Sequence, residues 1–129
     1  MKTTIAFAPQ LHIPNGTTDI SFYARAFGAE EAFRFTNDDG SVQVAELTIG
    51  DALFHLHEIK LSAGHFDPSQ HKGTTVIIGL FVPDVDAVMN SAIAAGAEVR
   101  SPAQDYDYGY RQGIVIDPFG QHWMIQKKI

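Results

Sequence analysis

The sequence contains no cysteine among its 129 residues. This absence excludes disulfide frameworks, thiolate nucleophiles, iron–sulfur clusters and every cysteine-based zinc site. Basic residues are also few, since nine Lys and Arg stand against fifteen Asp and Glu and give a net charge of -6. Binding to a phosphate backbone requires a basic surface, and the one adjacent basic pair, Lys127-Lys128, lies at the very end. We therefore expect no nucleic-acid partner.

Long apolar runs are missing as well. The longest covers residues 76–83, far short of the roughly 20 residues that span a bilayer. The first residues carry one positive charge but no apolar stretch of signal-peptide length. We therefore expect a cytoplasmic protein with no membrane partner.

With 45% hydrophobic and 19% charged residues, the chain has enough apolar side chains to form a single domain over residues 1–129.

The chain contains an approximate copy of itself. Ile13-Pro14 is followed, fifteen residues on, by Gly28-Ala29-Glu30, and Val82-Pro83 is followed, fourteen residues on, by Gly96-Ala97-Glu98. Ordered agreement of strand, helix and stop signals favours a duplicated module over chance similarity. We place the first module at about 8–58, a linker at about 59–74 and the second module at about 75–128.

Each module has one amphipathic helix. Apolar residues recur at i, i+3, i+4 and i+7 in both halves: Ile20, Tyr23, Ala24 and Phe27, then Val85, Val88, Met89 and Ala92. We expect Thr17 or Thr18 to cap the first helix and Asp84 the second. Gly28 and Gly96 supply the left-handed residue that ends each helix. Each helix therefore has one face to bury against a sheet.

Strand patterns surround each helix. Alternating or β-branched segments bounded by turn residues predict strands at 10–13, 31–36, 43–49 and 52–58, and again at 76–82, 98–101, 113–116 and 122–126. Asp117-Pro118-Phe119-Gly120 has the composition of a type I turn between the last two strands. The predicted fold class is α+β, with two tandem βαβββ modules forming curved mixed sheets around a cavity.

Two motifs give the sequence a family resemblance. The segment from Asp19 to Ala29 and the segment Asp117-Pro118-Phe119-Gly120-Gln121-His122-Trp123 resemble the vicinal oxygen chelate superfamily of glyoxalase I, extradiol dioxygenases and bleomycin-type resistance proteins. The segment from Asp107 to Arg111 is most similar to the PhnB-like branch. The resemblance covers residues from about 8 to 127 and specifies the fold better than the chemistry.

The resemblance implies four positions for metal ligands, on the first and fourth strands of each module. Those positions fall on Ala8, His55, Ile77 and Met124, and only His55 is a usual metal ligand. We therefore expect the protein to bind no metal. A two-residue shift keeps each side chain on the same face and offers a rebuilt divalent-metal site from other residues: Gln10 or His12, His57, Gly79 or Phe81, and His122 or Gln126.

Aromatic residues supply the other candidate site features. Tyr106, Tyr108, Tyr110 and Arg111 crowd a predicted loop, where they either cover the cavity mouth and orient a ligand or simply pack the loop on the sheet. We expect Phe81 to narrow the cavity and Trp123 to face the helices.

Three linker residues, His65, Asp67 and His71, resemble a loose metal cluster, but we expect them to be solvated surface residues.

These observations leave three functions open, of which the third is a subunit whose main role is to bind a partner. The first is a metal-independent protein that binds a small, aromatic or antibiotic-like molecule and forms a homodimer. Its expected ligand-binding residues are His12, His55, His57, Phe81, Tyr108, Tyr110, Arg111 and Met124. The second is a lyase, isomerase or dioxygenase that binds a divalent metal through His12, His55 or His57 and uses it as a Lewis acid.

Overall fold

Two βαβββ modules make up the computed structural model, which describes residues 4–129. The first comprises β1 (Gln10–Ile13), α1 (Phe22–Phe27), β2 (Glu30–Thr36), β3 (Val42–Ile49) and β4 (Ala52–Glu58). The second comprises β5 (Ile77–Phe81), α2 (Val85–Ala94), β6 (Glu98–Tyr106), β7 (Tyr110–Ile116) and β8 (His122–Lys128). The predicted duplication and the α+β class are confirmed.

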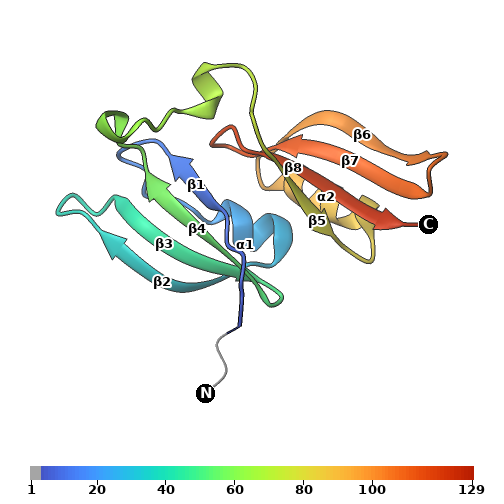
Figure 1. Ribbon diagram of the computed structural model, residues 1–129, viewed down its shortest axis with the longest axis horizontal. Coiled ribbons are helices and arrows are strands. Elements are labelled where there is room, and N and C mark those ends of the chain that lie inside the picture. Colours follow the sequence, from blue (N-terminus) through green and yellow to red (C-terminus); the bar gives the residue numbers. More distant parts are fainter. Residues whose placement is uncertain (1–3) are drawn as a thin grey trace.

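The two modules form separate four-stranded sheets that lie side by side (Figure 1). The strand orders are β1-β4-β3-β2 and β5-β8-β7-β6, so the same connections occur in both. In each sheet the first and fourth strands of the module pair in parallel and the remaining pairs are antiparallel. Each module is therefore a mixed sheet.

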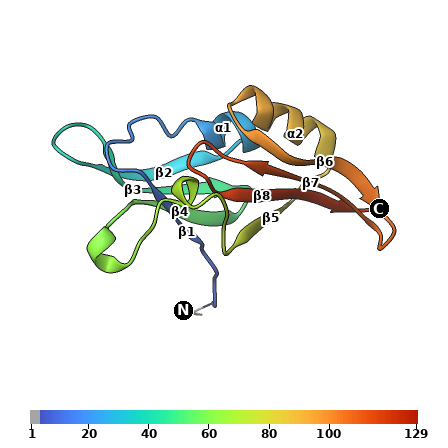
Figure 2. The same cartoon turned by 90° about the horizontal axis from the view of Figure 1, so that it is seen from above.

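Both helices lie on the same side of the two sheets and contact each other (Figure 2). The core between the helices and the sheets is built from buried apolar side chains, of which Trp123, Tyr23, Ile13 and Leu56 are among the largest. Trp123 is 1% exposed and its ring lies 4.7 Å from that of Phe27. The prediction that Trp123 faces the helices is confirmed, and burial of such rings is a main source of stability.

The start of α1 differs from the prediction. Thr17 does not cap the helix, because its hydroxyl donates to the Pro14 carbonyl at 2.6 Å. Ser21 occupies the N-cap position without a side-chain cap, and the Asp19 carboxylate accepts the Ser21 N–H instead. Two other helix signals are confirmed: the Asp84 carboxylate accepts the Ala87 N–H, and Gly28 ends α1 at φ 70°. In α2 the C-cap is Ala95 and Gly96 follows it at φ 114°, and Ala24 of the predicted α1 stripe is exposed.

The hairpin of β6 and β7 is longer than predicted. The prediction of a tyrosine-rich loop over 102–112 is wrong, because Tyr106 pairs with Tyr110 and Asp105 pairs with Arg111 within the ladder. Only residues 107–109 form the turn. Pro102 and the polar residues around it hide the strand pattern, and backbone pairing with β7 overrides that local signal.

The linker crosses from the end of β4 in the first sheet to the start of β5 in the second (Figure 1). It contains two short 3-10 turns, Leu61–Ala63 and Pro68–Gln70, and Asp67 caps the second by accepting the Ser69 N–H. A side chain at Gly120 would place its Cβ 2.6 Å from the Ser69 nitrogen. The second linker turn thus rests directly on the turn that follows β7. Among residues 4–129, no helix is long and apolar enough to cross a membrane.

Candidate functional site

One face of each sheet is open, because both helices cover the opposite face. In the first sheet Leu11 and Leu56 point into the core and are buried, while their strand neighbours His12 and His57 point the other way. The same alternation holds in the second sheet, where Trp123 and Ile125 are buried and Met124 between them is half-buried. Period-two geometry therefore places His12 and His57 of the first sheet and Met124 of the second on the open faces.

Three histidines lie together on the open face of the first sheet. His12 is directly opposite His57 in the parallel pair of β1 and β4, and their ring centroids are 6.5 Å apart. His55 stacks beside His57 at 5.9 Å, and its Nε2 lies 3.8 Å from the Glu46 carboxylate. The shared face expected for these histidines is confirmed.

A fourth histidine joins them from the linker. The ring of His65 lies 3.9 Å from the ring of His12, in a tilted stack. His65 Nδ1 accepts the backbone N–H of Lys60 at 3.1 Å, so in the neutral ring the proton is on Nε2. The Gln10 amide nitrogen lies 3.3 Å from His12 Nε2; an amide nitrogen can only donate, which in the neutral His12 ring puts the proton on Nδ1.

The histidines oppose one another's protonation. Burial lowers the pKa of His12 below its usual 6.5, and the neighbouring His65 and His57 lower it further. Burial also lowers the pKa of His57, with added contributions from His55, His65 and Lys60. This environment favours the neutral imidazole at His12 and at His57, which can donate and accept hydrogen bonds at the same time.

A large cavity lies where the linker crosses between the two sheets. It has a volume of about 1130 Å³ and is bounded by the start of β1, the linker and β5. Apolar residues supply much of its lining: Phe7, Pro9, Leu11, Phe66, Pro68, Val76, Ile77 and Ile78. Its polar side chains are Gln10, His12, His65, His71, Thr74, Thr75 and Gln121. We call this cavity the linker groove.

The predicted ligand-binding residues separate into distinct places. His12 alone of the eight lines the linker groove, and His55 and His57 continue from it across the first sheet. Phe81 and Tyr110 lie together at the far end of the second sheet, with ring centroids 6.3 Å apart, and Tyr108 lies 5.9 Å from Tyr110. We call Phe81, Tyr108 and Tyr110 the tyrosine end; Met124 lies between it and the groove on β8.

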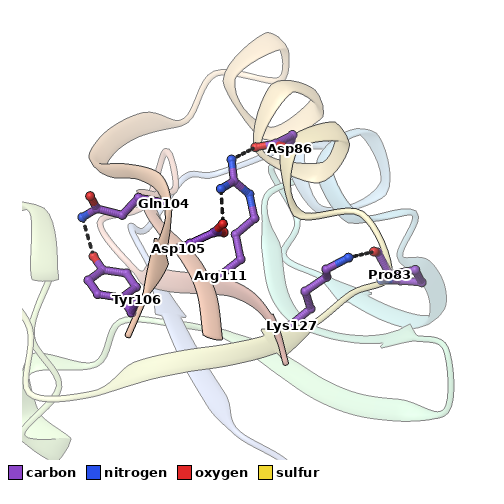
Figure 3. A network of polar contacts seen from close by, with 7 residues as sticks. All are labelled: Pro83, Asp86, Gln104, Asp105, Tyr106, Arg111 and Lys127. Carbon is purple, nitrogen blue, oxygen red and sulfur yellow. Dashed lines mark hydrogen bonds and ion pairs between the residues drawn. The ribbon is translucent and has the colours of Figure 1, made fainter. Parts of the chain in front are cut away.

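Arg111 lies on the helix side of the second sheet. Its guanidinium donates to Asp86 of α2 at 2.8 Å and to Asp105 of β6 at 2.9 Å (Figure 3). These hydrogen bonds raise the pKa of Arg111 above its already high usual value. The tyrosines Tyr106 and Tyr110 alternate with Arg111 along the hairpin and face the opposite side. The structure therefore does not bring Arg111 together with the histidines or the tyrosine end.

The residues at the four family positions do not fit a metal ion. Ala8 precedes β1, and Ile77 and Met124 carry no usual ligand atom for a divalent cation, which leaves His55 as the single suitable donor. Among residues 4–129, no three His, Asp or Glu side chains are arranged to hold a metal. The linker residue Asp67 is engaged with Ser69 and does not join His65 and His71 in a cluster.

Sequence reasoning missed most of the groove. His65 and His71 were expected to be solvated surface residues; both line the groove, where His65 is half-buried and His71 stays exposed. Phe66, which the prediction did not consider, lines it too and contacts His71 edge-on at 5.3 Å. Gln121 also lines it, and its side-chain amide donates to the His12 carbonyl at 3.0 Å, which joins the two modules. One signal for the groove was available in the sequence, because residues 64–73 combine histidines and glycines with Phe66.

Tandem βαβββ modules, with paired helices on one side and open sheet faces on the other, define the glyoxalase type of fold. The sequence pattern described as Glyoxalase/Bleomycin resistance protein/Dioxygenase superfamily matches residues 16–125, and the chain belongs to this family.

Known proteins of similar sequence or structure are spread across bacteria and plants. An uncharacterized protein of Mycobacterium bovis is 35% identical over 127 residues, which cover 96% of this chain and 84% of that protein. The structure of an Arabidopsis thaliana gene product matches with a TM-score of 0.71 and 24% identity, over 97% of this chain and all of that one. TioX from Micromonospora matches with a TM-score of 0.70 and 23% identity, over 96% of this chain and 100% of TioX. These structural likenesses concern the fold.

Proposed function

We propose that this protein is a metal-independent binding protein for a planar, largely apolar small molecule, and that the linker groove is its site. The observation that carries the proposal is a cavity of about 1130 Å³ with mainly apolar walls and a few converging polar side chains. Small-molecule sites have this composition and a volume of roughly 300–1,000 Å³. Aromatic and imidazole rings at the groove provide stacking surfaces for a flat ligand.

Metal independence rests on the donor set. Three of the four family positions lack a ligand atom that a divalent cation prefers. Two of the grouped histidines, His12 and His65, hydrogen-bond to Gln10 and to the Lys60 backbone. A Lewis-acid mechanism therefore has no support from the side chains of residues 4–129. Metal analysis of protein purified without a histidine tag tests this point. Stoichiometric metal that is lost on His55→Ala contradicts metal independence and favours the lyase, isomerase or dioxygenase alternative.

We further infer a homodimer of the PhnB-like branch, located in the cytoplasm. The open sheet faces support the dimer, because both expose aromatic side chains that nothing in residues 4–129 covers. Phe33 and Phe35 form an edge-to-face pair at 4.6 Å on β2, with Phe35 57% exposed, and Phe81 is 59% exposed on β5. Aromatic surface of this kind is typical of interfaces. The second copy of this chain is the partner we assign to it.

Ligand binding is tested with a neutral planar probe, 2-naphthamide. Calorimetric titration of the untagged protein should show saturable binding at one site per chain. Replacing Ile77 by Glu places a carboxylate in the apolar wall, and burial of that charge should weaken binding at least about tenfold. The matched control is Ile93→Glu, because Ile93 is comparably exposed on α2 and lies outside the groove. Absence of saturable binding, both for this probe and for probes with the same ring and a charged group, contradicts the proposal.

A further inference from the structure

The linker groove carries no formal charge of its own. Among residues 4–129, none of the side chains that line it belongs to Asp, Glu, Lys or Arg, although the chain has fifteen acidic residues. An ammonium ligand would leave water there without a carboxylate to receive it, which is costly. The wall chemistry therefore disfavours a cation.

The groove does offer a hydrogen-bond donor of known identity. Because His65 Nδ1 is held by the Lys60 N–H, the neutral ring has its hydrogen on Nε2. No hydrogen bond joins that Nε2 to another residue among 4–129, and His65 lines the groove. His65 also cannot turn freely, since its ring stacks on His12 at 3.9 Å. The donor is thus fixed in place before any ligand arrives.

A second cavity of mixed charge adjoins the groove on one side. A smaller cavity of about 570 Å³ shares Pro68 and Gly73 with the groove and is lined by Lys72 and Arg100. It also contains two carboxylates, Glu98 and Asp117. Asp117 is buried and takes up four donors from its own neighbourhood, so it is not free to bind a ligand.

We propose that the linker groove selects a planar aromatic ligand bearing a carboxylate or similar anionic oxygen group, which accepts a hydrogen bond from Nε2 of His65. This inference rests on the proposed function and specifies its ligand class. The apolar walls bury the ring, and the imidazole donor orients the anionic oxygen. Hydrogen bonds to ionised acceptors are stronger than those to neutral ones, so the group at this position decides affinity.

The overall charge of -6 acts against an anion at long range. At about 0.15 M salt the screening length is about 8 Å, so distant carboxylates contribute little at the groove. The local donor then outweighs the net charge of the chain. The comparison of ligands is therefore made at that salt concentration and at pH 7.5.

Three probes with the same ring test the inference: 2-naphthoate, 2-naphthamide and 2-naphthylmethylammonium, titrated calorimetrically into the full chain. We expect the carboxylate to bind about tenfold more tightly than the carboxamide, from the stronger charge-assisted hydrogen bond, and the ammonium to bind most weakly. If the carboxamide binds but the carboxylate binds no more tightly, or if the ammonium binds best, this inference is overturned and the proposed function stands. If none of the three binds, the proposed function fails as well.

Two substitutions at one position assign the donor. His65→Phe keeps a ring to stack on His12 but removes the N–H, so the carboxylate and carboxamide should then bind about equally. His65→Gln keeps an N–H donor and should retain a several-fold preference for the carboxylate. A full tenfold preference in His65→Phe contradicts the assignment to His65, whatever the affinity for the ring itself.

Discussion

Tyr23 Oη donates a 2.6 Å hydrogen bond to Asp117 Oδ2, which ties α1 of the first module to the turn after β7 of the second. The same Oδ2 accepts from Trp123 Nε1 at 3.0 Å, and Oδ1 accepts from the backbone of Phe119 and Gln121. Tyr23 is fully buried and Asp117 is 4% exposed. The two modules are thus joined by a satisfied polar cluster inside an aromatic core.

Tyr23→Phe should lower the free energy of unfolding by about 1–3 kcal/mol, because it removes a buried donor to an acidic group. Asp117→Asn should cost at least as much, since the amide NH₂ replaces one acceptor oxygen and faces donors. The matched control is Tyr106→Phe, whose hydroxyl accepts an exposed hydrogen bond from Gln104 (Figure 3). Urea unfolding measures all three, and equal losses for Tyr23→Phe and Tyr106→Phe contradict the role of the buried cluster.

Gly120→Ala should displace the linker. Gly120 has φ 88°, and an added Cβ would lie 2.6 Å from the Ser69 nitrogen, which is backbone and cannot move aside cheaply. Gly40→Ala is the control, since Gly40 has φ 85° and nothing within 4 Å of the added atom. The backbone strain of about 1–3 kcal/mol is common to both. We expect a larger stability loss and weaker 2-naphthamide binding in Gly120→Ala alone; identical behaviour contradicts the predicted packing.

Acid should destabilise the folded protein through its histidines. The pKa values of His12 and His57 are below the usual 6.5 in the folded state, so between those pKa values and 6.5 the unfolded chain binds more protons. Their contribution to stability is therefore complete above pH 6.5 and is lost as the pH falls through that window. Asp117 acts in the opposite direction, because burial raises its pKa above 3.8.

The double variant His12→Gln, His57→Gln separates these contributions. Its stability, measured by urea unfolding between pH 7.5 and 5, should fall less than that of the unchanged chain. Because Asp117 is retained in both proteins, its contribution cancels in the comparison. A pH dependence that is the same in both contradicts the assignment to the histidines.

The homodimer is tested through an exposed aromatic side chain. Phe35→Glu places a charge on the open face of the first sheet, at a residue that is 57% exposed, so it should disrupt association without lowering monomer stability by more than about 0.5 kcal/mol. Sedimentation should show a dimer for the unchanged chain and a monomer for the variant. A monomer at high concentration of the unchanged chain contradicts the dimer.

Local pattern was sufficient to predict most of the fold. The signals that predict it are short-range: two stripes of apolar residues, the glycines Gly28 and Gly96 at the helix ends, and the period-two strands. The structure has the helices and strands that these signals predict. The β6–β7 hairpin was shortened in the prediction because its residues around Pro102 are polar, and its strand character comes from pairing with β7. Pairing between strands is not encoded in one strand alone.

The candidate site was predictable only in part. Alternation along β1 and β4 placed His12, His55 and His57 on one face correctly, because side-chain direction follows from the strand itself. The groove depends on the linker folding back so that His65 stacks on His12 and its second turn rests on Gly120. Those contacts join residues far apart in sequence, and no local pattern specifies them.

Amide chemical-shift mapping with 2-naphthamide tests the central claim most directly, because glycines report from each region of the molecule. Gly64, Gly73 and Gly79 line the linker groove, whereas Gly109 lies in the turn at the tyrosine end and Gly40 and Gly50 lie in distant turns. We predict saturable shifts at the three groove glycines and none at the other three. Saturable shifts centred on Gly109, or no saturable shifts at the groove glycines, would contradict the linker groove as the ligand site.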